Sequence, residues 1–405
     1  MRILVVTQYF YPEQFRLNDI VAELVRRGHT ITVVTGLPNY PEGEIYPGYE
    51  YSYKELSTYN GAIVYRCNLR PRHKGSKNLA LNYLSFVVQA KNVLKTIKPE
   101  FDVIYVYGLS PVTVALPAIW YKKKYGIPVY FYCMDLWPDS IRDAQNGHRI
   151  MSKKNPIFII AKMLSIYAYK NVDIISNKCE EFSDYINAEC GISREKMIVL
   201  NEHAESSYLS ISEHPISNGI VDFMFLGNIG KSQNCDLLVE AFSRTDYKGK
   251  ARLHFVGDGS YAKELNKLVD EKGMTNDVVF HGKYPLSEIN SFYELADVCL
   301  LSLTSLTASG LTPPGKLFGY LAASRPILAA IGGPAKKIIE NAKCGYVISD
   351  RDIDGLAEYM QKIINNPSVL QKMGLNGRKY FLDNYTLGHH IIELEKHLYR
   401  LVDEK

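Results

Sequence analysis

The sequence predicts an α/β protein built from two doubly wound domains in series. The chain has 405 residues, more than one hydrophobic core usually serves. Short runs rich in Val, Ile and Tyr, typical of buried parallel strands, alternate with longer amphipathic stretches typical of helices. This alternation occurs twice along the chain, with a polar segment between the two series, so we expect two Rossmann-like domains.

The first series predicts a domain over residues 1–200. The stretch at residues 16–29 predicts a helix, because Ile20, Leu24 and Val25 share one face and Gly28 is a usual helix stop. The predicted strands lie at residues 2–7, 30–36, 62–67, 102–108, 128–133, 173–177 and 197–201.

The second series predicts a domain over residues 220–387. Residues 201–219 are polar and lack periodicity, which is typical of a linker. The predicted strands lie at 222–228, 251–259, 277–285, 297–303, 326–333 and 345–350, with helices at 235–242, 261–273 and 287–296. A final helix within residues 388–405 could return to pack on the first domain.

Composition excludes several classes of protein. A net charge of +4 gives no sign of a nucleic-acid binder. The seven cysteines show no CxxC spacing, which favours buried thiols in a reducing compartment over disulfides or a metal site. The first residues do not resemble a signal peptide, and no run of about 20 apolar residues could cross a membrane. We therefore expect a cytoplasmic protein without a bound metal.

Ligands of doubly wound sheets bind beyond the carboxyl ends of the strands, so the loops there are candidate sites. After the first strand of the second domain comes GNIGKSQN, residues 227–234. Its glycines, Gly227 and Gly230, allow close approach of the backbone to a phosphate, and Lys231 adds positive charge. The alternative interpretation is a tight turn with an exposed lysine.

The stretch PPGKLFGYLAASRP, residues 313–326, predicts a second phosphate-binding loop. Pro313 and Pro314 cannot lie inside a helix, so a helix should start near Gly315 or Lys316. The free amides of that helix start and the Lys316 charge together favour a diphosphate. A connecting loop with a solvated lysine is the alternative.

Two more loops of the second domain carry weaker signals. VGDGSY at residues 256–261 is either a glycine-rich anion loop or a turn in which Asp258 caps a helix. HGKYP at residues 281–285 ends a strand, and its backbone could hydrogen-bond a nucleobase.

The first domain offers polar groups for a second ligand. In DLWPDS, residues 135–140, a carboxylate could orient a sugar hydroxyl and Trp137 could stack on a sugar ring. Alternatively, Asp139 caps a helix and Trp137 belongs to the core. The loops at residues 9–19 and 35–43 supply further polar candidates, namely Glu13, Arg16, Asn18 and Asn39.

Basic and apolar residues mix in two segments, residues 70–88 and 148–170. Such patterning can lay a helix on an anionic membrane, although solvated helix faces would look similar. We expect membrane contact through these segments.

Taken in order, the motifs of residues 28–43, 135–140, 225–234, 278–303 and 313–331 resemble the family 4 retaining glycosyltransferases. The branch that they resemble contains bacterial O-antigen and capsule aminosugar transferases, such as the L-fucosamine transferases. The resemblance covers nearly the whole chain, and five motifs in the family order are more specific than any one of them. It implies an α/β GT-B fold, a nucleotide-sugar donor on the second domain, an acceptor on the first, and no bound metal or other cofactor.

The chain departs from the family pattern at several positions. Most members carry two glutamates eight positions apart in the last cleft loop and helix, and these positions are Leu311 and Gly319 here. Asn228 stands where the family has an arginine, with Lys231 displaced by a few positions. The family histidine of the first domain is replaced around Met134 and Asp135.

The resemblance implies a membrane-associated enzyme on the inner face of the cell membrane, without nucleic acid as a partner. It would move an N-acetyl aminosugar from a UDP-sugar to a polyprenyl diphosphate-linked saccharide during surface polysaccharide synthesis. The alternatives are a UDP-sugar 2-epimerase of GT-B fold and a catalytically inactive scaffold. The expected catalytic residues are Asp135, Lys231 and Lys316. The expected donor-binding residues are Gly227, Asn228, Gly230, Lys231, Gln233, Gly257, Lys283, Tyr284, Pro314, Gly315, Lys316 and Leu317, and the acceptor-binding residues are Glu13, Arg16, Asn18, Asn39 and Trp137.

Overall fold

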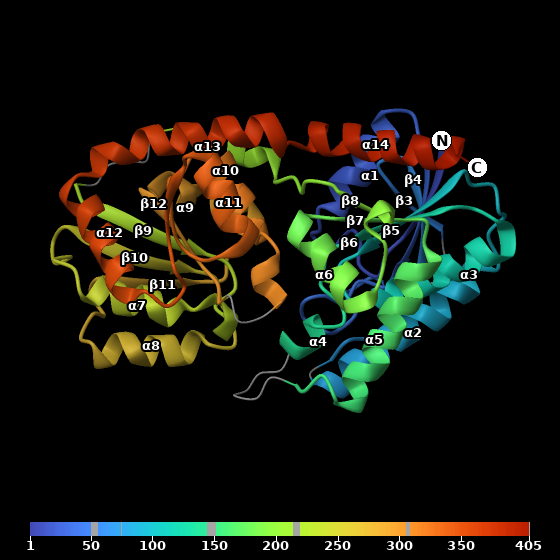
Figure 1. Ribbon diagram of the computed structural model, residues 1–405, viewed down its shortest axis with the longest axis horizontal. Helices are drawn as coiled ribbons and strands as arrows, with labels where there is room; N and C mark the ends of the chain where they lie inside the picture. Colours follow the sequence, from blue (N-terminus) through green and yellow to red (C-terminus); the bar gives the residue numbers. More distant parts are fainter. Residues whose placement is uncertain (50–55, 74, 144–150, 214–218, 305–307, 405) are drawn as a thin grey trace. The chain divides into compact units, whose positions relative to one another are not determined.

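Two compact units make up the chain, which is represented by a computed structural model. The structure describes residues 1–49, 56–73, 75–143, 151–213, 219–304 and 308–404 (Figure 1). The N-terminal unit consists of Met1–Asn201 together with Leu387–Lys405, and the C-terminal unit consists of Glu202–Thr386.

The N-terminal unit is built on an eight-stranded sheet with the order β3-β4-β2-β1-β5-β6-β7-β8. Its strands are β1 (Arg2–Val6), β2 (Thr30–Gly36), β3 (Leu56–Tyr59), β4 (Ala62–Cys67), β5 (Val103–Gly108), β6 (Val129–Cys133), β7 (Ile174–Asn177) and β8 (Met197–Val199). All neighbouring strands are parallel except β3 and β4, which pair antiparallel. Every strand predicted in this half forms; β3, at the sheet edge, was not predicted.

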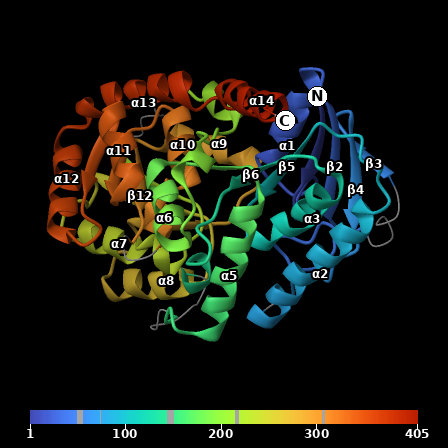
Figure 2. The same ribbon diagram turned by 45° about the vertical axis from the view of Figure 1, so that its right-hand side comes forward.

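Helices cover both faces of this sheet, as expected for near-continuous apolar strands. One face packs against α1 (Leu17–Arg26) and α14 (Leu387–Asp403). The other packs against α2 (Ser76–Leu94) and α3 (Ala115–Tyr125), and α5 (Pro156–Asn171) packs on α3 (Figures 1 and 2). Two further helices, α4 (Ser140–Asp143) and α6 (Glu180–Cys190), follow β6 and β7.

The C-terminal helix α14 is part of the N-terminal unit. Ile391, Leu394 and Leu398 are fully buried in the core that this helix shares with α1. Glu395 accepts hydrogen bonds from Arg27 (2.8 Å) and pairs with the His29 ring (2.8 Å). The apolar stripe of the last helix therefore completes a core that begins at residue 3.

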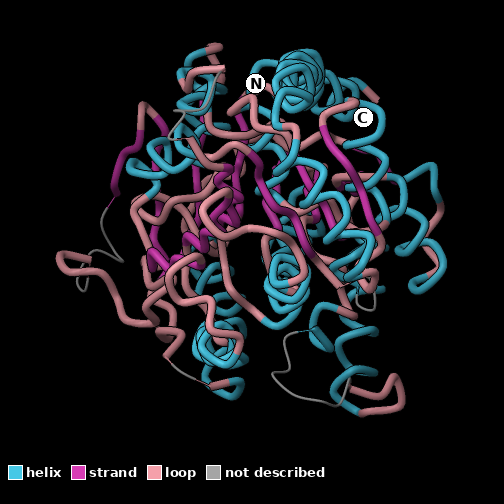
Figure 3. Tube along the Cα trace, turned by 90° about the vertical axis from the view of Figure 1, so that its left-hand side faces the viewer, coloured by secondary structure: helices cyan, strands magenta, loops and turns pink. Residues whose placement is uncertain are grey.

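The C-terminal unit contains a six-stranded parallel sheet with the order β11-β10-β9-β12-β13-β14. Its strands are β9 (Val221–Leu226), β10 (Ala251–Val256), β11 (Val278–Gly282), β12 (Val298–Ser302), β13 (Ile327–Ala330) and β14 (Gly345–Ile348). One face is covered by α7 (Cys235–Ser243), α8 (Ala262–Glu271) and α12 (Ile353–Asn365), the other by α9 (Ile289–Leu295), α10 (Gly315–Ala322), α11 (Gly333–Ala342) and α13 (Leu370–Asn384). Figure 3 shows strands between layers of helix.

Most of the expected linker packs on the C-terminal unit. Tyr208 and Ile211 are buried in its core, and the buried Arg325 side chain donates to the Ser212 carbonyl at 2.9 Å. Residues 202–213, which include the 3-10 turn η4 (Ser206–Ser210), are therefore packed on the C-terminal unit. The polar sequence of this segment did not predict this, because only a few apolar side chains make the contact. Residues 214–218 of the expected linker lie outside the described residues.

Two general expectations can be compared with the fold. All seven cysteines are buried, as predicted for structural thiols. Within the described residues, no helix has the combination of length and apolar sequence that crossing a bilayer requires.

Candidate donor and acceptor sites

The loops after β9, β10 and β11 are joined by backbone hydrogen bonds at the carboxyl edge of the C-terminal sheet. Ile229 N donates to the Asp258 carbonyl (2.9 Å), and Gly257 N donates to the Gly282 carbonyl (2.8 Å). Gly257 has φ 137°, and a Cβ there would lie 1.9 Å from the Gly227 carbonyl oxygen. Gly257 therefore lets the two loops approach each other closely, and its expected donor-binding role stays a prediction.

The Asp258 side chain does not cap a helix, although one of the two alternatives for this loop predicted that it would. The helix α8 begins after Tyr261, and no side chain caps it. Instead, Asp258 Oδ1 accepts from the backbone N of Gly259 at 2.7 Å. The 256–261 segment is thus a braced turn that supports the neighbouring 227–234 loop.

Lys316 stands at the start of α10, as the sequence predicted. The helix begins at Gly315, directly after Pro314. The Lys316 Nζ donates to Gln233 Oε1 at 2.7 Å and lies 3.8 Å from the centroid of the Phe225 ring. Burial lowers the pKa of Lys316 to about 8. Burial disfavours the charged form of Lys316, whereas a dianion bound beside it would favour that form. The site is therefore electrostatically suited to a diphosphate.

A Cβ added at Gly227 would lie 3.3 Å from Lys316 Nζ, so the loop after β9 and the start of α10 meet in space. Lys231 is exposed at the start of the 3-10 turn η5 (Lys231–Gln233), whose last residue bonds Lys316. Asn228 is exposed and Gly230 is buried. Residues predicted from two separate motifs therefore lie together in space.

Three other expected donor residues differ in their surroundings. Lys283 is exposed, and the Tyr284 ring, 39% exposed, lies edge-on to Phe292 at 4.8 Å. Leu317, in contrast, is fully buried in the core beside α9 and α13. Its expected donor contact is corrected, because this side chain anchors the helix rather than facing a ligand.

The structure explains one of the missing family glutamates. Gly319 is buried inside α10, and a Cβ there would lie 2.7 Å from the Tyr293 hydroxyl and 3.3 Å from the Tyr208 ring. Tyr208 comes from the segment expected to be a linker. The space that a carboxylate side chain would need is therefore filled by two tyrosines. Leu311, the other position, is half-buried at the end of the 3-10 turn η7 (Ala308–Leu311).

In the N-terminal unit, the expected acceptor residues brace loops. Glu13 is 2% exposed; its carboxylate accepts backbone hydrogen bonds from Phe10 (3.2 Å), Asn39 (2.9 Å) and Tyr40 (2.8 Å). Burial raises the pKa of Glu13 to about 7, although these three bonds oppose the shift. Glu13 thus holds the loop after β1 against the loop after β2.

Asn18 and Asn39 act in the same way. Asn18 Nδ2 donates to the Glu13 carbonyl (2.8 Å), and Asn39 Oδ1 accepts from Arg72 N (3.2 Å). Both are buried, so with Glu13 they are corrected from direct acceptor ligands to supports. Arg16 is half-buried at the N-cap position of α1.

Beside the loops after β1 and β2 lies a group of aromatic side chains with one arginine, here called the aromatic–arginine cluster: Tyr9, Phe15, Tyr40, Arg72 and Tyr83. Tyr40 contacts the Tyr9 and Phe15 rings with centroids 5.5 Å apart in each pair, and Arg72 Cζ lies 5.4 Å from the Tyr40 centroid. Burial raises the pKa of Tyr83, and the Arg72 charge opposes this shift. Sequence reasoning missed this cluster.

The sequence contains a pattern that could have identified Tyr83 as part of this cluster. It lies on α2 at helical spacing from the buried Phe86 and Ala90, whereas Leu84 and Val88 are exposed. The basic stretch at residues 70–88 therefore has two faces, and only one of them is available for a membrane.

Asp135 and Trp137 adjoin this cluster. Asp135 is half-buried after β6, and its charge contributes to the raised pKa of Tyr83, which is mainly due to burial. Trp137 is half-buried, and its indole N donates to Ser110 Oγ at 3.2 Å. Trp137 is therefore not a fully buried core residue, and its stacking on a sugar ring stays a prediction.

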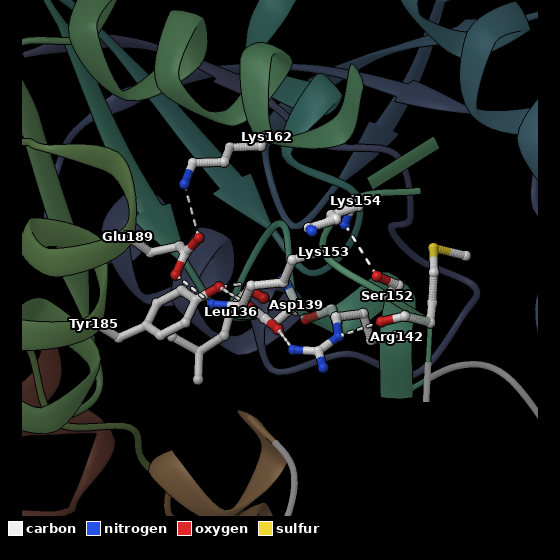
Figure 4. Close-up of polar contacts among 11 residues, drawn as sticks. Leu136, Asp139, Arg142, Ser152, Lys153, Lys154, Lys162, Tyr185 and Glu189 are labelled. Atoms are coloured by element: carbon white, nitrogen blue, oxygen red, sulfur yellow. Dashed lines mark hydrogen bonds and ion pairs between the residues drawn. The ribbon is translucent and has the colours of Figure 1, made fainter. Parts of the chain in front are cut away.

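Asp139, which the alternative interpretation made a helix cap, is a structural brace. Its carboxylate accepts from Tyr185 on α6 and pairs with Arg142 on α4 (Figure 4). Arg142 Nε also donates to the Met151 carbonyl at 2.8 Å. Nearby, Glu189 pairs with Lys153 (2.6 Å) and Lys162 (2.8 Å). These contacts fix the entry to α5 against α6.

No metal centre is found in the part of the chain that the structure describes, since no three His, Cys, Asp or Glu side chains gather in a suitable group. Among the groups that the described residues bring to the two sites are the Lys316 ammonium, the start of α10, aromatic faces and the Asp135 carboxylate.

Comparison with known proteins agrees with this architecture. Residues 14–201 match the family model described as glycosyl transferase 4-like domain, and residues 210–380 match the model described as glycosyl transferases group 1. The chain is 30% identical over 148 residues to a GDP-mannose-dependent alpha-(1-6)-phosphatidylinositol monomannoside mannosyltransferase of Mycolicibacterium smegmatis, covering 35% of this chain. That match spans only 38% of the relative's length.

A longer match is 23% identical over 346 residues to the putative colanic acid biosynthesis glycosyl transferase WcaI of Escherichia coli, covering 80% of this chain and 81% of the relative. Among solved structures, Anabaena Alr3699/HepE in complex with UDP superposes with a TM-score of 0.70 and 12% identity, covering 99% of this chain and all of that one. With both domain models matched in order on a GT-B fold, the chain belongs to the group 1 glycosyltransferases.

Proposed function

We propose that this protein is a retaining, metal-independent glycosyltransferase that uses a UDP-sugar donor. By resemblance, the sugar is an N-acetyl aminosugar and the acceptor is a polyprenyl diphosphate-linked saccharide used for O-antigen or capsule. Support for a surface polysaccharide comes from the similarity to a colanic acid transferase. Support for UDP comes from the fold shared with a protein solved with UDP.

The observation that carries the proposal is the position of Lys316. Its partly desolvated ammonium lies beside the Gly227 backbone and at the first turn of α10. Departure of a nucleoside diphosphate develops negative charge on the phosphate oxygens, and a preorganised cation at the positive end of a helix dipole stabilises that charge. Lys231, exposed on the same loop, would add a second charge.

The reaction then needs positioning more than a protein nucleophile. An acceptor hydroxyl would attack the anomeric carbon from the face that the diphosphate leaves, which retains the configuration. We assign the acceptor to the aromatic–arginine cluster, where aromatic faces suit a sugar ring and Arg72 suits a phosphate oxygen. Asp135, half-buried beside this cluster, is the candidate for orienting the acceptor hydroxyl.

Peripheral membrane contact on the cytoplasmic side belongs to the same proposal. Along α5, Ile157, Ile160, Met163 and Tyr167 form an exposed stripe, with Met163 66% exposed. Leu84 and Val88 are exposed on α2. No Asp or Glu occurs in α2, α3 or α5, while each contains lysine. An acid-free, lysine-bearing surface with exposed apolar side chains is suited to anionic lipid.

The test is transfer in vitro. The full chain is incubated with a panel of UDP-sugars and a synthetic polyprenyl diphosphate-linked saccharide, and the product is followed by mass spectrometry and its anomeric configuration by NMR. Transfer with retention supports the proposal. Absence of transfer across the panel together with absence of UDP binding contradicts it, and release of an epimerised sugar without acceptor would favour the epimerase.

A further inference from the structure

A chain of three polar side chains crosses the C-terminal sheet beneath α9. Asp222 on β9 is fully buried and His254 on β10 is 3% exposed. Asp222 Oδ1 lies 2.8 Å from His254 Nε2, and His254 Nδ1 lies 2.9 Å from Nε2 of His281 on β11. The two imidazole rings are nearly parallel, with an interplanar angle of 17°. Buried polar groups on a sheet face are costly unless each is satisfied, so this arrangement calls for an explanation.

The hydrogen-bond directions follow from the chemistry of the groups. An ionised carboxylate can only accept, so His254 Nε2 carries a proton and donates to Asp222. In neutral His254, Nδ1 must then accept, and His281 Nε2 must be the donor. His281 Nδ1 is left with a lone pair. Within the described part of the chain, the His281 ring makes no hydrogen bond other than the one to His254. His281 therefore presents a hydrogen-bond acceptor.

His281 occupies the edge of the sheet beside the candidate donor site. It is half-buried, and its ring lies edge-on to Phe292 at 5.0 Å, with Tyr284 on the same phenylalanine at 4.8 Å. The next residue, Gly282, bonds the Gly257 loop that packs on Gly227. Since β11 lies two strands from β9, the His281 ring and the loop that meets Lys316 are separated by about 10 Å in the sheet direction. A ribose and a base can bridge such a gap.

We propose that His281, held in one tautomer by His254 and Asp222, selects the base of the donor by accepting a hydrogen bond from a ring N–H. This inference rests on the proposed nucleotide-sugar function and adds to it a specificity-determining residue. Uracil carries such a ring N–H at N3 and guanine carries one at N1, whereas the corresponding ring nitrogen of cytosine or adenine is itself an acceptor. Against cytosine, two lone pairs would face each other.

The same chain predicts how the selection changes with pH. Burial and the neighbouring His254 lower the pKa of His281 from its ordinary value of 6.5, which favours the neutral form of the His281 ring at pH 7. One proton added to the pair can reverse the bond between the two rings, which turns His281 Nδ1 into a donor. The other titratable or charged groups around the rings are Asp222, Asp297, whose carboxylate accepts from Asp222 N at 2.8 Å, and Lys283 and Tyr284 after β11. From α9, the ring of Phe292 contacts His281, and no charged α9 side chain bonds either histidine in the described structure.

The experiment measures binding of UDP and of CDP to the full chain by isothermal titration calorimetry. Wild type should favour UDP at about pH 7.5, and this preference should shrink as the pH is lowered, because a proton added to the hydrogen-bonded pair turns His281 Nδ1 from an acceptor into a donor. His281→Phe keeps an aromatic ring against Phe292 but lacks the acceptor, so UDP affinity should fall about fivefold to tenfold, the worth of one hydrogen bond. CDP affinity should not fall, and the pH dependence of the ratio should disappear.

Two comparison variants separate recognition from folding. His281→Asn can still offer a carbonyl oxygen and should retain part of the UDP preference. His389→Asn, at an exposed histidine of α14, should behave as wild type. An unchanged UDP to CDP ratio in a folded His281→Phe protein would overturn this inference alone. If wild type bound neither nucleotide, the proposed function would fail and the inference with it.

Discussion

At the residue scale, Lys316 is the group on which the proposed donor site depends, and neither Leu311 nor Gly319 places a carboxylate beside it. The nearest polar partner recorded for its ammonium is a neutral amide, Gln233, rather than a carboxylate. A carboxylate there would hold the lysine charge permanently, whereas an amide leaves it available to an incoming anion. Position 319 has no room for a glutamate side chain, because Tyr208 and Tyr293 fill the space around Gly319.

Replacement of Lys316 should therefore affect the chemical step. We expect Lys316→Ala to lower kcat for transfer by about 100-fold to 1,000-fold, comparable with removal of one preorganised donor to a developing anion. In wild type, the ammonium is present below its pKa of about 8 and lost above it, so UDP affinity should fall as pH rises through 8. Steady-state kinetics and calorimetry from about pH 6.5 to 9.5 measure both effects.

Lys316→Arg and Lys336→Ala serve as comparisons for this prediction. An arginine stays charged across that range, so any UDP binding that it retains should not weaken above pH 8. Lys336 is an exposed lysine of α11 paired only weakly with Glu340, at 3.7 Å, and its loss should leave kcat unchanged. Equal pH profiles for wild type and Lys316→Ala would contradict the assignment.

At the scale of elements, the helices on one face of the N-terminal sheet combine two roles. The inner side of α2 carries Tyr83 toward the aromatic–arginine cluster, and its outer side exposes Leu84 and Val88. The entry to α5 is fixed by Asp139, Arg142 and Tyr185 (Figure 4). A rigid attachment of this kind keeps an exposed apolar stripe from collapsing onto the protein.

The stripe on α5 gives a prediction about membranes. The double variant Ile160→Asn with Met163→Asn should bind vesicles containing anionic phospholipid at least about tenfold more weakly, because two exposed apolar side chains lose their burial in lipid. Co-sedimentation at increasing salt measures this, and added salt should weaken wild-type binding because lysines contribute. Leu382→Asn, at a 44% exposed leucine of α13, is the matched control. Identical vesicle binding by both variants would exclude α5 as the contact.

At the scale of the whole molecule, the last helix of the chain belongs to the same unit as its first strand. The last helix, α14, supplies Ile391, Leu394 and Leu398 to the core of the unit that contains residue 1. His390 adds a hydrogen bond between its Nδ1 and the Asn201 carbonyl at 2.7 Å. The N-terminal unit is therefore discontinuous in sequence, and its stability depends on the end of the chain.

This arrangement predicts a large effect of a small change near the C-terminus. Leu394→Ala should lower the free energy of unfolding of the N-terminal unit by about 2–5 kcal/mol, through lost burial and the cavity left behind. Ile392→Ala, at the 52% exposed neighbour on the same helix, should cost less than about 1 kcal/mol. Urea unfolding followed by circular dichroism compares the two, and equal costs would mean that α14 does not contribute to the core.

Local sequence was sufficient for much of this molecule. Strands such as 30–36 and 62–67 were predicted at their observed bounds, because short runs rich in β-branched and aromatic residues are typical of strands. The start of α10 at Gly315 followed from the two prolines before it. β3 was missed, since an edge strand is held by a single neighbour and carries a weaker pattern.

The sequence by itself determined the α/β class, the two repeated sheets and the lysine-bearing loops, because each of these depends on residues adjacent along the chain. Only the tertiary structure decided which polar groups are available to a ligand. Glu13 and Asn39 have the residue types of ligand groups, but folding pairs them with backbone amides from other loops. Asp222, His254 and His281, up to 59 residues apart in sequence, become one hydrogen-bonded chain. Whether a side chain is satisfied depends on partners brought close in space, and no local pattern encodes them.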